Sequence, residues 1–217
     1  MLRGVIFDMD GVIIDSHPIH KRAWRKFFEA LDLAVSDQEL DFVLDGRKKE
    51  DILRHFLGNL SDAEIKDYGH QKEMLFREEA MNIEPISGVM RLLEELTNEG
   101  ISIAVASCGS HSRVRYILDQ LKIHDRFEAI VTADDIRNGK PDPEVFCKAA
   151  DVLGAGRENL LVCEDAVSGV KAAKAAGMRC LGITEPARAA ELLQAGADRV
   201  VQDFASISVA ELESILA

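Results

Sequence analysis

The chain has 217 residues, of which 47% are hydrophobic, and a formal net charge of −12. This hydrophobic fraction can build a substantial core, which excludes a disordered chain, and the length fits one large domain or a main domain with a smaller insert. The negative charge argues against a general nucleic-acid or anionic-membrane surface, and no stretch approaches the roughly 20 apolar residues of a membrane-spanning helix.

The first predicted element is a short apolar strand at residues 5–7, which leads directly into Asp8, Asp10 and Gly11. A short apolar run bounded by a turn signal is typical of a buried strand. Alternation along the strand points the Asp8 and Asp10 side chains the same way. Neighbouring carboxylates repel each other, so such a pair is usually kept to hold a cation or to divide catalytic work. Taken alone, the motif leaves a turn and a functional site equally open.

Residues 16–82 form a block of a different character, rich in charge and in helical patterning. Aromatic residues such as Trp24 and Phe27 recur at helical spacing, and no strand-like alternation occurs in the stretch. We therefore predict a helical block (residues 16–82) inserted immediately after the first strand. The remaining residues, 1–15 and 83–217, would form the main domain.

From residue 86 onward, predicted helices and strands alternate regularly. The strands cover 101–106, 129–131, 160–163, 179–183 and 199–201, and the helices cover 89–100, 111–121, 143–153, 166–176, 187–195 and the C-terminus. Strands that are apolar on both faces and alternate with helices predict an α/β fold with a doubly wound parallel sheet. Ligands of such sheets bind beyond the carboxyl ends of the strands, so the helical block would act as a lid there.

Polar residues follow four of the predicted strands, and we expect them to converge on one edge of the sheet. Ser107 precedes a helix start, where a hydroxyl and backbone N–H groups make a cradle for phosphate or carboxylate. Lys140 offers a cation to a phosphate oxygen or to an aspartate nucleophile. Glu164 and Asp165, together with Asp8, supply the hard oxygen ligands that Mg²⁺ prefers.

This set of side chains can transfer a phosphoryl group. Asp8 could attack phosphorus in line, and Asp10 could protonate the leaving oxygen and later activate water. Each residue also has a plainer explanation: Ser107 could only cap a helix, Lys140 could be a solvated loop lysine, and the acids could complement a helix dipole. Their joint placement at successive strand ends favours the catalytic interpretation.

The chain resembles the haloacid dehalogenase superfamily of phosphohydrolases, in the branch with a small helical cap after the first motif. Four motifs carry the resemblance, in the expected order: Phe-Asp-Met-Asp-Gly-Val at 7–12, Ala-Ser at 106–107, Gly-Lys-Pro-Asp-Pro at 139–143 and Glu-Asp-Ala-Val-Ser-Gly at 164–169. Dehalogenating members of the family lack the second acid of the first motif and need no metal. Asp10 is present here, so the resemblance implies Mg²⁺-dependent phosphoryl transfer.

The resemblance also implies the site residues. Asp8 would be the nucleophile and Asp10 the general acid/base. The phosphate site would comprise Ser107, Cys108 and Lys140. The Mg²⁺ ligands would be Asp8, the Asp10 backbone carbonyl and Asp165, with Glu164 assisting directly or through water.

The nearest subgroup resembles the β-phosphoglucomutase-like proteins, which include mutases and many small-molecule phosphatases. His20 could hold Asp10 when the cap closes or could be a helix-surface histidine, and Trp24 is better explained as part of the cap core. The basic loop at 46–49 could hold substrate or could only be solvated. The predicted substrate-facing residues are His20, Gly46, Arg47, Lys72 and His111.

Two features favour a sugar-phosphate phosphatase over a mutase. Mutases of the subgroup carry Lys-Asn in the loop after the motif serine, where this chain has Ser110 and His111, and Lys49 replaces their cap arginine. A β-phosphoglucomutase-type mutase remains the alternative. A phosphoacceptor signalling domain shares the acids, hydroxyl and lysine, but it is about half this length and has no helical insert.

The surroundings of the protein follow from a few further features. The four cysteines lie far apart and form no C-x-x-C pair, which suits reduced thiols. The N-terminus enters the first strand at once and leaves no room for a signal peptide. We expect a cytoplasmic monomer whose partner is a small phosphorylated substrate, without nucleic acid or membrane.

Overall fold

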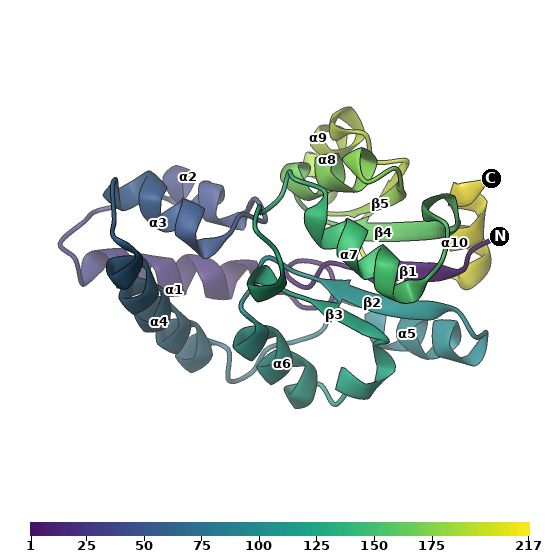
Figure 1. Cartoon of the computed structure of the whole chain (residues 1–217), viewed down its shortest axis with the longest axis horizontal. Coiled ribbons are helices and arrows are strands. Elements are labelled where there is room, and N and C mark those ends of the chain that lie inside the picture. The colour runs from purple at the N-terminus through teal and green to yellow at the C-terminus, as the bar shows by residue number, and fades with distance from the viewer.

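The computed structural model describes residues 1–217 and contains one parallel sheet of six strands, in the order β3-β2-β1-β4-β5-β6 (Figure 1). The strands are β1 (Gly4–Phe7), β2 (Ser102–Ala106), β3 (Ala129–Val131), β4 (Leu160–Glu164), β5 (Arg179–Ile183) and β6 (Arg199–Val201). The chain starts in the middle of the sheet, builds one side outward and then builds the other. This order is that of a doubly wound sheet, so the predicted fold class is confirmed.

Helices cover both faces of the sheet, because its strands are apolar on both sides. The helices beside the sheet are α5 (Val89–Asn98), α6 (His111–Gln120), α7 (Glu144–Leu153), α8 (Val167–Ala175), α9 (Ala189–Ala195) and α10 (Val209–Leu216). Side chains of α5, α6 and α10 share one buried cluster with Val5 and Phe7 of β1, whereas those of α7, α8 and α9 share another with Ile6. Alternate residues of β1 therefore anchor opposite helical layers.

The helical block contains no strand. Its helices are α1 (His17–Glu29), α2 (Asp37–Leu40), α3 (Lys49–Leu57) and α4 (Asp62–Glu79), and Figure 1 shows them grouped at one end of the molecule. Trp24, Phe27 and Phe28 form the centre of a separate buried cluster with residues of α3. None of the helices in the protein combines the length and the apolar character needed to span a bilayer.

Two chain segments, one before and one after the helical block, connect it to the sheet domain and lie side by side. Residues on either side of the block pair with each other, since Ile14 bridges Pro85 and the Asp15 N–H donates to the Glu84 carbonyl at 3.1 Å. Ile19 and Phe76 extend from the block into the buried cluster of the sheet domain. The block is therefore packed against the sheet domain through the bases of α1 and α4.

Short 3₁₀ turns complete the chain. They are η1 (Asp41–Leu44), η2 (His124–Arg126), η3 (Ala133–Asp135), η4 (Arg157–Asn159) and η5 (Pro186–Arg188). The helix expected over 187–195 begins instead with η5 and becomes α-helical at Ala189. Pro186 at the first position of this turn suits the start of the helical segment, because its φ is fixed near the helical value.

Candidate active site

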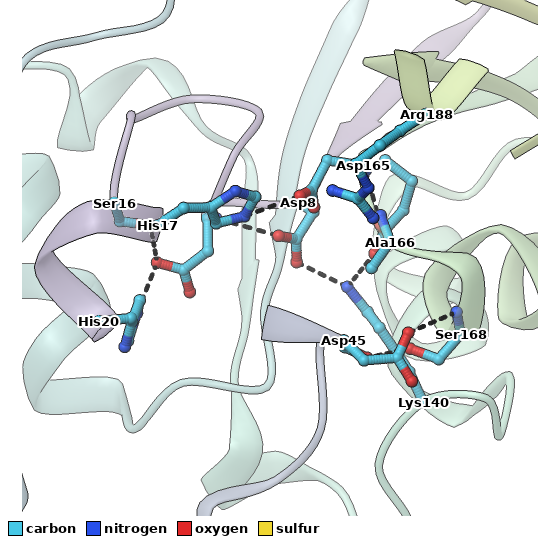
Figure 2. Close-up of polar contacts among 12 residues, drawn as sticks. Asp8, Ser16, His17, His20, Asp45, Lys140, Asp165, Ala166, Ser168 and Arg188 are labelled. Carbon is cyan, nitrogen blue, oxygen red and sulfur yellow. Dashed lines mark hydrogen bonds and ion pairs between the residues drawn. The ribbon is translucent and has the colours of Figure 1, made fainter. Parts of the chain in front are cut away.

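Asp8 follows β1 directly and lies at the carboxyl edge of the sheet, against a lysine. The Nζ atom of Lys140 lies 2.6 Å from Asp8 Oδ1 and 2.5 Å from Glu164 Oε1. The Lys140 side chain is fully buried, and Figure 2 shows it reaching toward Asp8 with Asp165 and His17 close by. Residues far apart in the sequence thus form one buried ionic group, because β1 and β4 are neighbours in the sheet.

Burial sets the acid–base character of this group. It raises the pKa of Asp8 to about 7, although the Lys140 cation opposes the rise. Burial also raises the pKa of Glu164. Burial alone would lower the pKa of Lys140, but the carboxylates of Asp8 and Glu164 hold it well above its usual value. Lys140 therefore stays protonated and supplies the positive charge that allows Asp8 to ionise in a dry environment.

Both carboxylate oxygens of Glu164 have donors. Its Oε2 accepts the backbone N–H groups of Asp165 and Ala166, both at 2.8 Å, while Oε1 accepts Lys140. The side chain is also fully buried. Glu164 is thus placed to orient Lys140 and the following loop.

Asp165 differs from Glu164 in having a donor-free oxygen. Its Oδ2 is buried without a hydrogen-bond donor, and His17 Nε2 lies 2.8 Å from it without hydrogen-bond alignment. Gly11 has a φ of +74° and faces this oxygen, so a Cβ there would lie 2.4 Å from it. No three acidic, histidine or cysteine side chains of the chain lie together in a metal-binding arrangement. The hard oxygens of Asp8 and Asp165 nevertheless fit Mg²⁺ in their chemistry, and Asp165 Oδ2 is available to it.

Asp10 faces the helical block and has four polar side-chain atoms around its carboxylate. Its Oδ1 accepts the Ser16 hydroxyl at 2.6 Å and lies 3.1 Å from His20 Nε2. Arg113 of α6 donates from Nη1 to Oδ1 at 2.9 Å and from Nη2 to Oδ2 at 2.7 Å. Burial alone would raise the pKa of Asp10, but the neighbouring Arg113 and His20 hold it well below the usual value.

The helical block and the sheet edge enclose one cavity of about 810 Å³ that is partly open to solvent. The cavity lies at the carboxyl edge of the parallel sheet, where such sheets bind their ligands. Of the residues predicted from the sequence, those that line the cavity are Asp8, Asp10, His20, Gly46, Arg47, Lys72, Ser107, Cys108 and Asp165. Lys140 and Glu164 lie buried behind this lining. Trp24 lines the cavity and also belongs to the core of the block.

His111 is the one predicted substrate-facing residue that the structure places elsewhere. It is exposed and does not line the cavity, and its backbone N–H donates to Asp134 Oδ2 at 2.9 Å. His111 is the first residue of α6, and successive helical residues point about 100° apart. The side chain therefore leaves the cavity although its neighbour Ser110 lines it.

Residues 5–183 match the family model of the haloacid dehalogenase-like hydrolases. The chain belongs to this family. β-Phosphoglucomutase of Bacillus subtilis (strain 168) is 33% identical to it, over 96% of this chain and 92% of that protein. Hexitol phosphatase A of Escherichia coli (strain K12) is 31% identical, over 95% and 94%. The family predicted from the motifs is thereby confirmed.

A solved structure shows the same fold. The crystal structure of β-phosphoglucomutase from Clostridium difficile superposes with a TM-score of 0.89 at 26% identity, and covers 100% of this chain and 97% of that one. A haloacid dehalogenase-like hydrolase with these relatives is an enzyme of the phosphatase and phosphoglucomutase type, related to proteins that act on phosphorylated sugars.

Two residues of this hydrolase's site were missed by the sequence analysis. Arg113 and His17 both line the cavity, and each contacts an acid of the motifs. The sequence holds a weak signal for Arg113, because Gly109 leaves space for it: a Cβ on Gly109 would lie 2.1 Å from Arg113 Nη2. Glycine has no side chain, so it lets the guanidinium of Arg113 approach the backbone closely at this position.

Gly169→Ala is expected to destabilise the fold by about 1–3 kcal/mol, the usual cost of overpacking. A Cβ at this position of α8 would lie 1.8 Å from Glu164 Oε1, so the carboxylate that holds Lys140 would have to move. Urea unfolding measures the change. The matched control is Gly69→Ala in α4, where only the flexible end of Lys49 is near. This control should be neutral or more stable, because alanine favours helix; equal stabilities of the two variants would contradict the expectation.

Proposed function

We propose that the chain is a Mg²⁺-dependent phosphatase that hydrolyses a small phosphorylated metabolite, a sugar phosphate, through an aspartyl-phosphate on Asp8. The observation that carries the proposal is the buried contact of Asp8 with Lys140, at the edge of a cavity that the helical block covers. The relationship to hexitol phosphatase A and to a phosphorylated carbohydrates phosphatase of Thermotoga maritima supports the substrate class.

In the proposed reaction, Asp8 attacks phosphorus in line with the leaving oxygen. A bond forms between the carboxylate and phosphorus, the bond to the leaving oxygen breaks, and Asp10 gives that oxygen a proton. Asp10 then takes a proton from water, which attacks the phosphorus, regenerates Asp8 and releases inorganic phosphate. Lys140 and the buried Ser107 bind the transferring oxygens.

The proposed Mg²⁺ would be held by Asp8, the backbone carbonyl of Asp10 and Asp165. When bound, it neutralises charge on the carboxylates and on the transferring phosphoryl group. Glu164 contributes in a different way, by holding Lys140 beside Asp8.

The helical block is proposed to be the cap that selects the substrate. Three of its cavity-lining residues keep a buried polar atom without a hydrogen-bond partner, namely Arg47 Nε, Glu50 Oε2 and Glu73 Oε1. Buried polar atoms are nearly always satisfied, so unpaired ones in a cavity favour a ligand that supplies partners. One donor and two acceptors suit the hydroxyl groups of a sugar, which can accept and donate.

The test is a panel of sugar phosphates, polyol phosphates and nucleotides, with released inorganic phosphate as the readout. We expect release from sugar phosphates in Mg²⁺, loss of release on chelation, and recovery when Mg²⁺ is restored. Activity that survives chelation would refute the metal dependence. Failure to release phosphate from any phosphomonoester would refute the phosphatase.

The mutase alternative rests on the relationship to β-phosphoglucomutases. It is tested in the same panel with β-glucose 1-phosphate, with and without a hexose bisphosphate. Isomerisation stimulated by the bisphosphate would replace hydrolysis as the function. Predominant phosphate release would support the phosphatase.

A further inference from the structure

Arg113 and Asp10 form a bidentate ion pair in the cavity. The two guanidinium nitrogens donate to the two oxygens of one carboxylate, and the Arg113 side chain is only 7% exposed. Such a bidentate pair is both stronger and more directional than a single charge contact. Asp10 Oδ1 also accepts from Ser16, so this oxygen has its acceptor positions filled.

This ion pair conflicts with the role of Asp10 as acid/base in the proposed reaction. An acid/base must present an oxygen to the leaving group and then to water, at hydrogen-bond distance. In the arrangement seen here, both oxygens of Asp10 are directed to Arg113 instead. Asp10 must therefore leave Arg113, at least in part, before it can carry a proton. The guanidinium would keep its contact with His20 Nε2, 2.8 Å from Nη1, but a buried cation that loses its carboxylate needs another anionic partner.

We propose that Arg113 is a positioning residue that holds Asp10 in the resting enzyme, and that Glu73 of the helical block receives the guanidinium when Asp10 is released. This inference rests on the proposed function. Glu73 lines the same cavity, and its Oε1 is buried without a hydrogen-bond partner. Arg77, one turn further along α4, forms an ion pair with this oxygen at 3.6 Å, which is too long for a hydrogen bond. Its Oε2 lies 3.5 Å from the hydroxyl of Ser110, the N-cap residue of the helix that carries Arg113.

Arg113 packs against the helix that carries Glu73. The guanidinium lies 5.1 Å from the ring centre of Phe76, which stands on the same face of α4 as Glu73, three residues earlier. The Glu73 charge already acts on Arg113, since after Asp10 it is the next acid that raises the pKa of the guanidinium against burial. Gly109 packs closely against the guanidinium on another side, since a Cβ there would lie 2.1 Å from Arg113 Nη2.

The exchange would couple the helical block to proton transfer. Arg113 and Asp10 belong to the sheet domain, whereas Glu73 belongs to the block. The position of the block over a bound substrate therefore decides which carboxylate holds Arg113. When the block covers a substrate, Asp10 would be released from Arg113. When the cavity is empty, Asp10 would stay paired with Arg113 and would not activate water.

The test is a double-mutant cycle of Glu73→Gln and Arg113→Met, with kcat and KM measured on the best alkyl phosphomonoester of the panel. Glu73→Gln should lower kcat about tenfold, because general acid–base catalysis is worth more than that, and should leave KM within about twofold. The defect should disappear in the Arg113→Met background, where nothing remains to be released. Arg115→Met is the matched control, since Arg115 lies on the same helix with its side chain 63% exposed, and it should match the wild type.

Three results would overturn the proposal. Unchanged kcat in Glu73→Gln would show that Glu73 does not accept the guanidinium of Arg113 during the reaction. A defect of full size in the double variant would show that Glu73 acts on the substrate directly. A loss of kcat in both Arg113→Met and Arg113→Lys that does not depend on Glu73 would show that Arg113 holds Asp10 in its working position; the lysine variant keeps a cation if the methionine variant folds poorly.

A second experiment measures the Arg113–Asp10 ion pair without catalysis. In the Mg²⁺-free protein, the losses of unfolding free energy caused by Arg113→Met and Asp10→Asn should be far from additive, because both break the same pair. Additive losses would show that Arg113 and Asp10 do not stabilise each other as an ion pair. A wild type that releases phosphate from no substrate would refute the proposed function, and the unfolding cycle would still decide whether Arg113 holds Asp10.

Discussion

Asp8→Asn is expected to abolish phosphate release, with a loss of at least about 10⁴-fold in kcat, the scale seen when a nucleophile is removed. The amide is a poor nucleophile, yet it has the shape of the carboxylate. Its oxygen can still accept from Lys140, and the backbone N–H of Asp10, which donates to Asp8 Oδ2 at 3.0 Å, remains beside it. The variant should therefore fold, and released phosphate together with circular dichroism measures both properties.

Asp198→Asn is the matched control for that loss. Asp198 accepts from Lys174 and Arg179, both at 2.7 Å, and lies just before β6, at the opposite end of the strand from the carboxyl edge. Its replacement should lower stability and leave kcat unchanged. Phosphate release by Asp8→Asn above about one-hundredth of the wild-type rate would require another nucleophile and would contradict the aspartyl-phosphate mechanism.

The convergence of the motif residues could be predicted because it follows from topology. Parallel strands end at one edge of a sheet, so residues placed just after β1, β2 and β4 must be neighbours once these strands pair. The order β2-β1-β4 in the middle of the sheet brings Ser107, Asp8 and Glu164 to that edge. Only the alternation of strands with helices, which makes the sheet parallel, was needed for this prediction, and not the exact packing of the helices.

The contacts made from helices could not be predicted in the same way. Arg113 stands on α6 beside Val114, on a face that is otherwise buried and apolar, and a long side chain can reach a distant partner from such a place. His17 likewise begins α1 and meets Asp165, a residue 148 positions later in the numbering. Helical periodicity tells which face a residue occupies, but the partner of that face is set by tertiary packing.

The docking of the helical block was hidden for a related reason. Phe76 repeats the helical pattern of the block, and yet it packs into the sheet domain's cluster, 4.6 Å from the ring of His20. An apolar residue at helical spacing does not reveal which of two hydrophobic clusters it joins. The block's role as a cap, and any exchange of partners within it, therefore depends on contacts that only the structure provides.

Lys140→Met is expected to destabilise the protein by about 3–5 kcal/mol, the cost of removing one partner from a buried ion pair. Methionine fills nearly the same volume, so the loss would come from charge. Without the cation, the carboxylates of Asp8 and Glu164 would face each other in a site where both are buried. Phosphate release should also be lost, because Asp8 would no longer be held ionised. Urea unfolding and the phosphate assay measure the two effects.

Adding Glu164→Gln to Lys140→Met should recover part of the stability. The glutamine oxygen can keep accepting the backbone N–H groups of Asp165 and Ala166, and its amide can turn a donor toward Asp8, which removes the repulsion between two unpaired carboxylates. Activity should stay lost, since the amide carries no charge to hold the transferring phosphate. A double variant no more stable than Lys140→Met would mean that packing, rather than the balance of buried charge, makes Lys140 necessary to the fold.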